Sequence, residues 1–249
     1  MTTDVRLTVD VEDWYDGMGV LGERFPKPEG AASGLSGLIG LLQGAKGSPR
    51  VTLFVVGNYA ATVAGELDEL VAAGHEIASH GPDHGRLPED PTRLTEWLRT
   101  GRAVLEDLLQ APVRGFRSPR FDVPSSLGLE RYRELVANAG FAYVTDTSFL
   151  GERSPIRELP VLSVRGLPLG GGSYQRLLPA PVVSRAVGRG GGTAVLYYHS
   201  YDFGATLPGL GSIRSVAAAK QLVGRGRVAA VFSSILARYG SKVCADVER

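Results

Sequence analysis

The chain has 249 residues, 43% of them hydrophobic, and a formal net charge of +1 with Lys and Arg spread along its length. This size and composition allow a substantial core, and the charge predicts neither a nucleic-acid footprint nor a polybasic membrane patch. The single cysteine, Cys244, excludes a disulfide framework and a cysteine-based zinc site.

The predicted elements alternate between short β-branched runs and longer helical stretches. Strands are expected, in chain order, at 5–12, 50–57, 75–80, 113–119, 141–148 and 193–202. Helices are expected at 34–45, 59–74, 91–109, 127–140, 213–226 and 228–240. This alternation indicates parallel strands covered by helices, and the length favours a single-domain α/β barrel over residues 1–249.

Two Gly- and Pro-rich segments, 15–33 and 165–192, interrupt the alternation. They are interpreted either as flexible connections or as loops over a site. The first ten residues lack the apolar core of a signal peptide, and no apolar run reaches the roughly 18 residues of a membrane span. We therefore expect a cytoplasmic protein without membrane insertion, unless the start site is misassigned downstream of a signal.

Ionisable residues lie at the ends of the predicted strands. Asp10 ends the first strand, His80 the third, and His199 the last, while Arg117 and Asp146 end two strands between them. In a parallel barrel all strand carboxyl ends meet at one rim. Unpaired burial of such groups would be costly, so their positions predict a functional site at that rim.

His80 and His84 have the spacing of paired metal ligands. A single histidine is more often structural, but two imidazoles beside a carboxylate suit Zn²⁺ with an open position for water. Asp10 and Glu12 are two residues apart on a strand, so their side chains point the same way. One of them can bind the metal while the other accepts a proton from water.

Several segments together resemble the polysaccharide deacetylases of the NodB-homology type, carbohydrate esterase family four. In chain order these are LTVDVEDW, VTLFVVGNYA, GHEIASHGPDH, GFRSPRF, YVTDTS and LYYHSYD. The first segment is similar to the Asp-Val-Glu variant of the family's first motif, and ELPV with GGGSYQRLLP resembles a subgroup acting on surface or capsular polysaccharides. The resemblance implies a distorted (β/α)7 barrel.

The resemblance also implies roles for the residues near the first two motifs. Asp10 would be the general base and Arg117 would orient it. Glu12, His80 and His84 would hold the metal, usually zinc, although another divalent transition metal would fit the same ligands.

Further roles follow from the later motifs. His199 would be the general acid, with Asp146 pairing to it and raising its pKa. A backbone N–H after Pro119, from Arg120 or Phe121, would form part of the oxyanion hole.

The sequence departs from the commonest family pattern at several positions. Strand alternation favours Glu12 over Asp13 as the metal ligand, but a bulge at the strand end would reverse that. Arg120 stands where an aromatic residue is more usual, and either binds an acidic sugar group or is a solvated loop residue. Trp14 and Tyr174 either stack on a sugar ring or pack at the rim.

The expected function is a metal-dependent hydrolase that removes an acetyl group from an N-acetylated sugar, in a polysaccharide, a glycan precursor or a glycoside. One alternative is a hydrolase of another C–N amide in a small metabolite. The other is a non-catalytic carbohydrate-binding relative. The sequence does not identify the sugar or the oligomeric state, and it does not separate N- from O-deacetylation.

Overall fold

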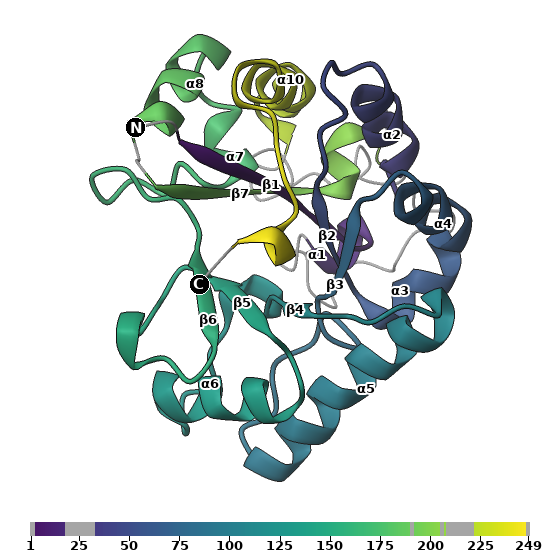
Figure 1. Cartoon of the computed structure of the whole chain (residues 1–249), viewed down its shortest axis with the longest axis vertical. Helices are drawn as coiled ribbons and strands as arrows, with labels where there is room; N and C mark the ends of the chain where they lie inside the picture. Colours follow the sequence, from purple (N-terminus) through teal and green to yellow (C-terminus); the bar gives the residue numbers. More distant parts are fainter. Residues whose placement is uncertain (1–2, 18–32, 190–191, 205–206, 208–221, 248–249) are drawn as a thin grey trace.

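Seven parallel strands form one curved sheet in the order β6-β5-β4-β3-β2-β1-β7, surrounded by helices (Figure 1). The computed structural model describes residues 3–17, 33–189, 192–204, 207 and 222–247. The strands are β1 (Asp4–Val11), β2 (Thr52–Val55), β3 (Glu76–Ser79), β4 (Gly115–Phe116), β5 (Tyr143–Asp146), β6 (Arg157–Pro160) and β7 (Thr193–His199).

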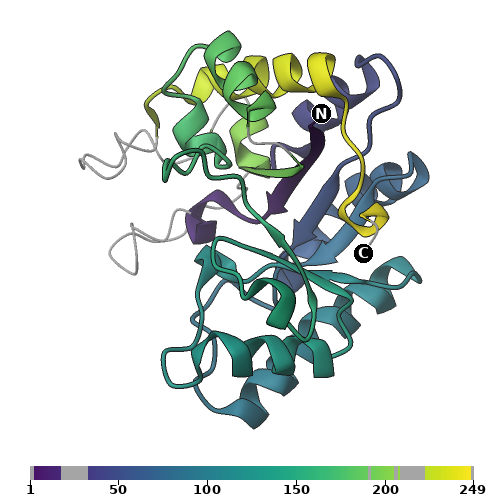
Figure 2. The ribbon, with the colours of Figure 1, turned by 60° about the vertical axis from the view of Figure 1, so that its left-hand side comes forward.

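Helices connect most consecutive strands and cover the outside of the sheet. Their bounds are α1 (Trp14–Gly17), α2 (Leu35–Gln43), α3 (Gly57–Ala60), α4 (Ala64–Ala72), α5 (Pro91–Leu109), α6 (Gly128–Asn138), α7 (Gly172–Gln175), α8 (Ala180–Gly188) and α10 (Val228–Tyr239). The pair α5 and α6 and the pair α8 and α10 cover opposite sides of the barrel (Figure 2). In α5, Asp90 caps the first turn by accepting a hydrogen bond from the Arg93 N–H at 2.9 Å.

β1 illustrates how the sequence separates the inside of the barrel from its outer shell. Val5, Leu7, Val9 and Val11 are buried in the large apolar core beneath the helices. The alternating residues face the other way, since successive side chains on a strand point to opposite faces. Polar side chains of this strand, including Asp10, therefore line the interior of the barrel.

The barrel is nearly closed. β6 and β7 are not paired along their length, but Val161 forms a parallel bridge with Val195, and the Leu162 N–H donates to the Val195 carbonyl at 2.9 Å. Beyond β6, a second bridge joins Gly171 to Tyr197. These contacts bring β6 next to β7 and complete the ring of strands.

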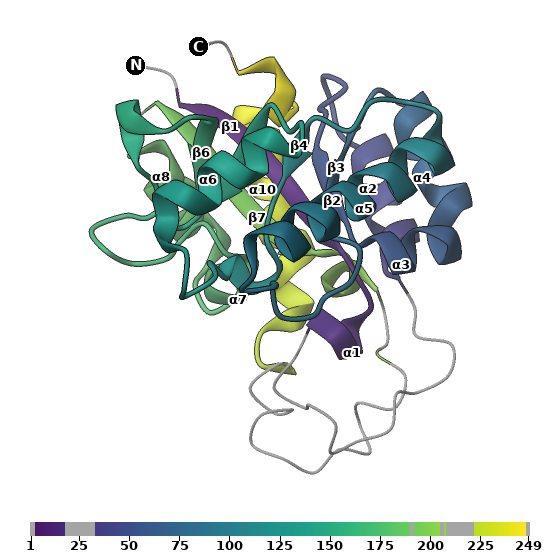
Figure 3. The same ribbon diagram turned by 90° about the horizontal axis from the view of Figure 1, so that it is seen from below.

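The C-terminal segment closes the end of the barrel where the strands begin. The short 3-10 helix η8 (Cys244–Asp246) packs there, and the Cys244 N–H donates to Thr52 Oγ1 at 2.8 Å. Arg6 donates to the Val243 carbonyl from inside the same end. β1 begins near this plug and ends at α1 on the opposite side of the molecule (Figure 3).

Most expected elements are confirmed within a few residues. All six expected strands are present, as are the helices expected at 34–45, 91–109, 127–140 and 228–240, while the helix expected at 59–74 is divided into α3, the 3-10 helix η2 (Ala61–Val63) and α4. The segment 165–192 is not a plain connection, because it contains α7 and α8. Most of 15–33 and of the helix expected at 213–226 lies outside the described residues.

One strand was missed. The sequence of β6, RELP, contains no β-branched residue and so gives no strand signal. Its strand conformation depends on pairing with β5 and on the neighbouring β7, which are contacts between distant parts of the chain. Among the described residues, no helix is long and apolar enough to cross a lipid bilayer.

Candidate metal centre and active site

The strand register brings the expected site residues to one rim. Asp10 and His199 are register partners on the neighbouring strands β1 and β7. On the other side of β1, Asp10 pairs with Phe54 of β2, and Phe54 pairs with Ala78 of β3, two residues before His80. The chain therefore places the first, third and last strand ends beside one another, as the sequence predicted.

Glu12, His80 and His84 form a cluster whose ligand atoms all lie within 4.8 Å of one another. Glu12 Oε2 is 2.8 Å from His84 Nε2 and 3.7 Å from His80 Nε2. All three side chains are buried, with at most 5% of their surface exposed. Asp13 turns away from this cluster, and its Oδ1 accepts the Tyr15 N–H at 2.8 Å at the start of α1.

The chemistry of this cluster fits a divalent cation. Burial lowers the pKa of His80, against the opposing effect of Asp10 and Glu12, and so favours the neutral imidazole that metals bind. His80 Nδ1 lies 2.9 Å from the Arg117 carbonyl oxygen, which can only accept, so this contact assigns the proton to Nδ1. Nε2 is then free to act as a ligand. A buried carboxylate facing two imidazoles is stabilised by a cation.

Arg117 is fully buried and connects three strands. Its guanidinium donates to Asp10 Oδ1 at 2.5 Å, to Thr8 Oγ1 at 2.8 Å and to Thr145 Oγ1 at 2.7 Å. It also lies 4.1 Å from the centre of the Phe54 ring, in cation–π geometry. Burial alone would raise the pKa of Asp10, but the charge and hydrogen bond of Arg117, together with the charges of His80 and His199, outweigh burial and lower it. Asp10 is therefore ionised and held in one orientation.

His199 pairs with Asp202, contrary to the expected pairing with Asp146. His199 Nδ1 is 3.5 Å from Asp202 Oδ2, and His199 Nε2 is 3.8 Å from Glu12 Oε1. Burial lowers the pKa of His199, but the nearby carboxylates of Asp202 and Glu12 outweigh it and raise the pKa to about 9. His199 is therefore protonated at neutral pH.

Asp146 has a different partner. Its Oδ2 accepts from Arg133 at 2.9 Å, and its Oδ1 accepts the Thr147 N–H at 2.6 Å. Arg133 also donates to Glu158 at 2.7 Å. The expected pairing of Asp146 with His199 was wrong because Arg133, a buried residue of the helix directly before β5, forms an ion pair with Asp146 instead. Arg133 joins α6 to β5 and β6.

The loop after Arg117 offers one amide to the site. The Phe121 N–H donates to the Ser118 carbonyl at 3.1 Å, whereas the Arg120 N–H has no acceptor among the described residues. Arg120 and Phe121 both have a φ of 56°, in the left-handed region that non-glycine residues rarely adopt. This geometry leaves the Arg120 amide, directly after the buried Pro119, as the candidate oxyanion donor.

The side chains of this loop are already engaged. Arg120 bonds to Asp122 at 3.3 Å and to the Gly85 carbonyl at 3.0 Å. These contacts anchor its guanidinium on the rim and partly neutralise it. The Phe121 ring meets Tyr197 edge-on at 5.0 Å and covers Arg117.

The two expected sugar-stacking residues differ in exposure. Trp14 is fully buried, so neither face of its ring is available to a sugar, and the packing interpretation of this residue holds. Tyr174, in α7, is 49% exposed. Tyr174 therefore keeps a surface that a ligand could contact.

Sequence reasoning missed Asp202 and Tyr201. Tyr201 stacks on the His199 ring, with 4.9 Å between centroids and 6° between planes. Both residues belong to the quoted segment LYYHSYD. The spacing His-x-x-Asp could have indicated Asp202, because the chain turns into the 3-10 helix η5 (Ser200–Phe203) directly after the strand.

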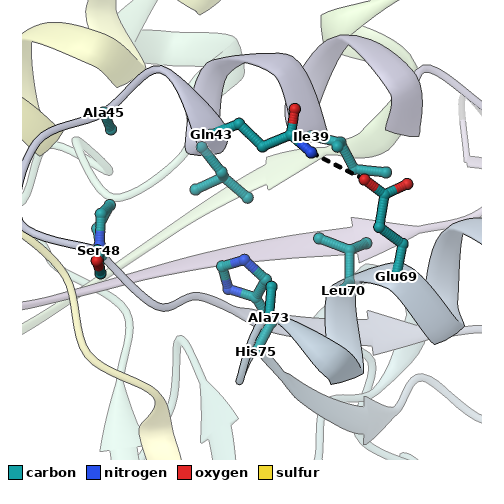
Figure 4. Close-up of a pocket in the computed structure, with 10 residues that line it drawn as sticks. Ile39, Gln43, Ala45, Ser48, Glu69, Leu70, Ala73 and His75 are labelled. Atoms are coloured by element: carbon teal, nitrogen blue, oxygen red, sulfur yellow. Dashed lines mark hydrogen bonds between the residues drawn. The ribbon is translucent and has the colours of Figure 1, made fainter.

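A second pocket holds another histidine but no comparable set of groups. This pocket, between α2 and α4, has a volume of about 240 Å³ and is partly spanned by a 2.9 Å hydrogen bond from Gln43 to Glu69 (Figure 4). His75 lies in it, and its Nδ1 accepts the Val51 N–H at 3.1 Å. Burial lowers the pKa of His75, so its role there is that of a neutral structural acceptor.

Residues 39–144 match the family described as polysaccharide deacetylase. Over this segment the chain is similar to the polysaccharide deacetylase family. The match contains His80, His84 and Arg117 but ends before His199 and begins after Glu12. Residues 136–247, which include His199 and Asp202, match the family described as domain of unknown function DUF3473. No curated protein matches the chain.

Solved structures share the fold at low identity. A putative polysaccharide deacetylase from Mycobacterium smegmatis has a TM-score of 0.60 and 22% identity, over 92% of this chain and 84% of that one. PuuE allantoinase has a TM-score of 0.57 and 14% identity, over 97% and 86% of the two chains. BA3943 from Bacillus anthracis, a CE4 family pseudoenzyme, has a TM-score of 0.55 and 12% identity, over 98% and 65%.

Proposed function

We propose that this protein is a metal-dependent deacetylase that removes the acetyl group of an N-acetylated sugar. The observation that carries the proposal is the convergence of Glu12, His80 and His84 with Asp10 on one side and His199 on the other. The family match over residues 39–144 supports the same reaction class. A binding protein would need neither an ionised carboxylate nor a protonated imidazole beside such a cluster.

Glu12, His80 and His84 are the residues that would hold the ion. Three protein ligands of the N, N, O type suit a catalytic Zn²⁺ site. A divalent ion held there would supply Lewis acidity toward the acetyl carbonyl and increase the acidity of water at the site.

The protein side chains then divide the proton transfers between them. Asp10, ionised and fixed by Arg117, accepts a proton from the attacking water. The Arg120 N–H donates to the oxygen that gains charge as the carbonyl carbon becomes tetrahedral. His199, protonated at neutral pH, donates to the sugar nitrogen as the C–N bond breaks. The products are acetate and a free amine.

Asp202 acts in this scheme as a positioning residue for His199. Its carboxylate lies on the Nδ1 side of the ring, and Tyr201 covers one ring face. Together they orient Nε2 toward Glu12 and the centre of the site. Asp202 therefore takes the role that the sequence motif suggested for Asp146.

The proposal is tested by measuring acetate release from N-acetylhexosamine oligomers, O-acetylated xylan and cyclic amides of small metabolites. We expect release from the N-acetylated sugars, loss of activity on chelation, and recovery on adding Zn²⁺. Asp10→Asn should abolish turnover while the protein keeps its metal. Hydrolysis that resists chelation, or full activity of Asp10→Asn, would reject the assigned roles. Turnover confined to the cyclic amides would indicate a small-metabolite amidohydrolase instead.

A further inference from the structure

The C-terminal part of the chain has an uneven charge distribution. Residues 159–245 contain ten Lys and Arg residues and one acidic residue, Asp202, which is buried. The rest of the chain contains 17 basic and 25 acidic residues. Lys and Arg are spread along the chain as the sequence indicated, but the acidic residues are not, so the net charge of +1 combines a positively and a negatively charged part.

The same part of the chain carries most of the exposed apolar surface. Nine large hydrophobic side chains are exposed among the described residues, and six of them fall between residues 167 and 223. Leu177 is 54% exposed and Val182 49% exposed. Such side chains grouped together indicate an interaction surface rather than ordinary scatter.

Helix α8 presents basic and apolar side chains on its outer face. Val182, Arg185 and Arg189 are exposed and lie at spacings of three and four residues, on one side of the helix axis. The opposite side, with Val183 and Val187, is buried toward α10. The outer face of α8 therefore combines arginines with an exposed valine, whereas a face that contacts only water is normally polar throughout.

The arginines of this surface have no acidic partners. Among the described residues, Arg185, Arg189 and Arg227 have neither an ion pair nor a side-chain hydrogen bond. On α5 and α6, by contrast, Arg102 pairs with Glu106 and Arg131 with Glu134. The positive charge of α8 and its neighbours is thus available to an external anion.

This surface runs along one flank of the barrel, and one end of it borders the mouth of the candidate active site. Its other end, at Arg189, lies where the strands begin, because the Gly188 carbonyl accepts a hydrogen bond from Thr3 Oγ1 just before β1. Gly224 packs against the backbone of Arg176, so the segment before α10 lies against the chain just after α7. Arg225 donates to the carbonyls of Tyr201 and Gly204, so the same segment is bonded to the loop that follows His199. α7 and the start of α10 lie on the same side of the molecule as α1, where the strands end (Figure 3).

We propose that the surface formed by Leu177, Val182, Arg185, Arg189, Leu222 and Arg227 docks onto an anionic lipid bilayer. Unpaired guanidinium groups are attracted to anionic headgroups, and the exposed leucine and valine side chains gain by entering the boundary with the acyl chains. A hydrated polyanion would offer nothing to those apolar side chains. Docking in this way lays the flank formed by α8 and α10 along the membrane with the mouth of the barrel at one end of it, and, resting on the proposed function, it makes a membrane-attached glycan the substrate.

The test measures binding of the whole chain to vesicles by flotation. Equimolar phosphatidylglycerol and phosphatidylcholine vesicles are compared with pure phosphatidylcholine vesicles, at low and high salt. We expect binding to the anionic vesicles, binding at least about tenfold weaker to the neutral ones, and release by salt. Equal binding to both vesicle types, or no binding to either, would overturn the proposal.

Matched variants locate the surface. Arg185→Glu/Arg189→Glu should weaken binding at least about tenfold, whereas Arg93→Glu/Arg153→Glu, with the same change in net charge elsewhere, should bind as the parent does. Leu177→Ser should also weaken binding, and Val104→Ser should not. Thermal melting confirms that each variant is folded.

Two outcomes would contradict the proposal that this surface docks onto a bilayer. If soluble polygalacturonate competes fully and Leu177→Ser binds vesicles unchanged, the surface binds polyanions and the bilayer proposal fails. If the α8 variants bind like the parent, the docking surface is not here. Acetate release from a soluble substrate is measured separately, so failure to bind vesicles leaves the proposed reaction untouched.

Discussion

Asp202 Oδ2 lies 3.5 Å from His199 Nδ1, although the two residues are only three apart in the chain. The 3-10 helix that follows β7 turns the carboxylate back beneath the imidazole of the preceding strand end. One short segment thus supplies both the proposed acid and the group that orients it. Asp146, from β5, is held by Arg133 instead.

This pairing predicts that Asp202→Asn lowers kcat by about 10- to 100-fold with little change in KM. The loss is smaller than the roughly 100- to 10,000-fold contribution of a general acid, because His199 remains in place and substrate contacts are kept. Asp202 raises the pKa of His199, so its loss lowers that pKa from about 9. Since the acid must be protonated, the alkaline limb of the kcat/KM profile should move to lower pH. Profiles measured between pH 6 and 10 check this shift.

Asp146→Asn is the matched control for this change. It should reduce stability through Arg133 but leave the alkaline limb in place. An unchanged limb in Asp202→Asn, or an equal shift in Asp146→Asn, would return the role to Asp146.

The metal cluster predicts different results for two histidine substitutions. His84→Ala removes one of three ligands and should lower bound zinc from about one ion per chain to near zero, measured by elemental mass spectrometry after dialysis. His75→Ala, in the pocket between α2 and α4, should retain the ion. Zinc added to the metal-free parent should raise Tm by mass action, because the ligands converge only in the folded chain. A His84→Ala protein that keeps full zinc occupancy would contradict the assignment.

The positions of Asp10, Glu12, His80 and His199 could be predicted because strand ends in a parallel barrel share one rim, and each of these residues ends its strand. The partner of His199 could not be predicted from the sequence. It depends on Arg133, whose buried guanidinium forms an ion pair with Asp146 and so leaves Asp202 as the carboxylate beside His199. Arg133 lies on a helix, and helical spacing alone does not reveal that its side chain points under the sheet.

The segment 165–192 shows a second limit of sequence reading. Its glycines and prolines indicated loops, yet α7 and α8 form there because Val183 and Val187 bury one face of α8 against α10. Tertiary packing outweighs weak local propensity in such short helices. The strand β6 was not predicted for the same reason, because its conformation depends on tertiary contacts and not on local propensity.

Glu76 predicts a pH-dependent stability at the closed end of the barrel. Its carboxylate accepts from Thr52 Oγ1 at 2.8 Å, the Ala245 N–H at 3.0 Å and the Tyr143 hydroxyl at 2.9 Å. Burial outweighs these bonds and raises the pKa of Glu76 above 4.5. Its stabilising contribution is therefore fully present below pH 4.5 and is lost as pH rises through the folded pKa. Glu76→Gln stays neutral and can keep all three contacts, so its free energy of unfolding relative to the parent should increase from pH 4.5 to pH 8.

Glu89 provides a control of opposite sign. Hydrogen bonds from the Ser126 hydroxyl and N–H lower the pKa of this exposed carboxylate to about 2. Its stabilising contribution is present above the unfolded pKa and is lost as pH falls. Most of that loss lies between pH 4.5 and pH 2, so Glu89→Gln should change little relative to the parent from pH 4.5 to pH 8. Urea unfolding at both pH values measures the two differences, and parallel slopes for the two variants would contradict the explanation.

Cys244 reports whether the C-terminal plug stays closed. The thiol is fully buried, and burial raises its pKa to about 12 from 9.0. The thiolate fraction at pH 8 is then about a thousandfold lower than in the unfolded chain, so alkylation by iodoacetamide should slow by at least that factor in the native protein. Because the chain has one cysteine, the native and guanidinium-unfolded rates both report this site.

Thr52→Val removes the acceptor of the Cys244 N–H and one donor to Glu76, so it should increase native alkylation while the fold persists. Rapid alkylation of the parent protein would show instead that η8 leaves the end of the barrel readily.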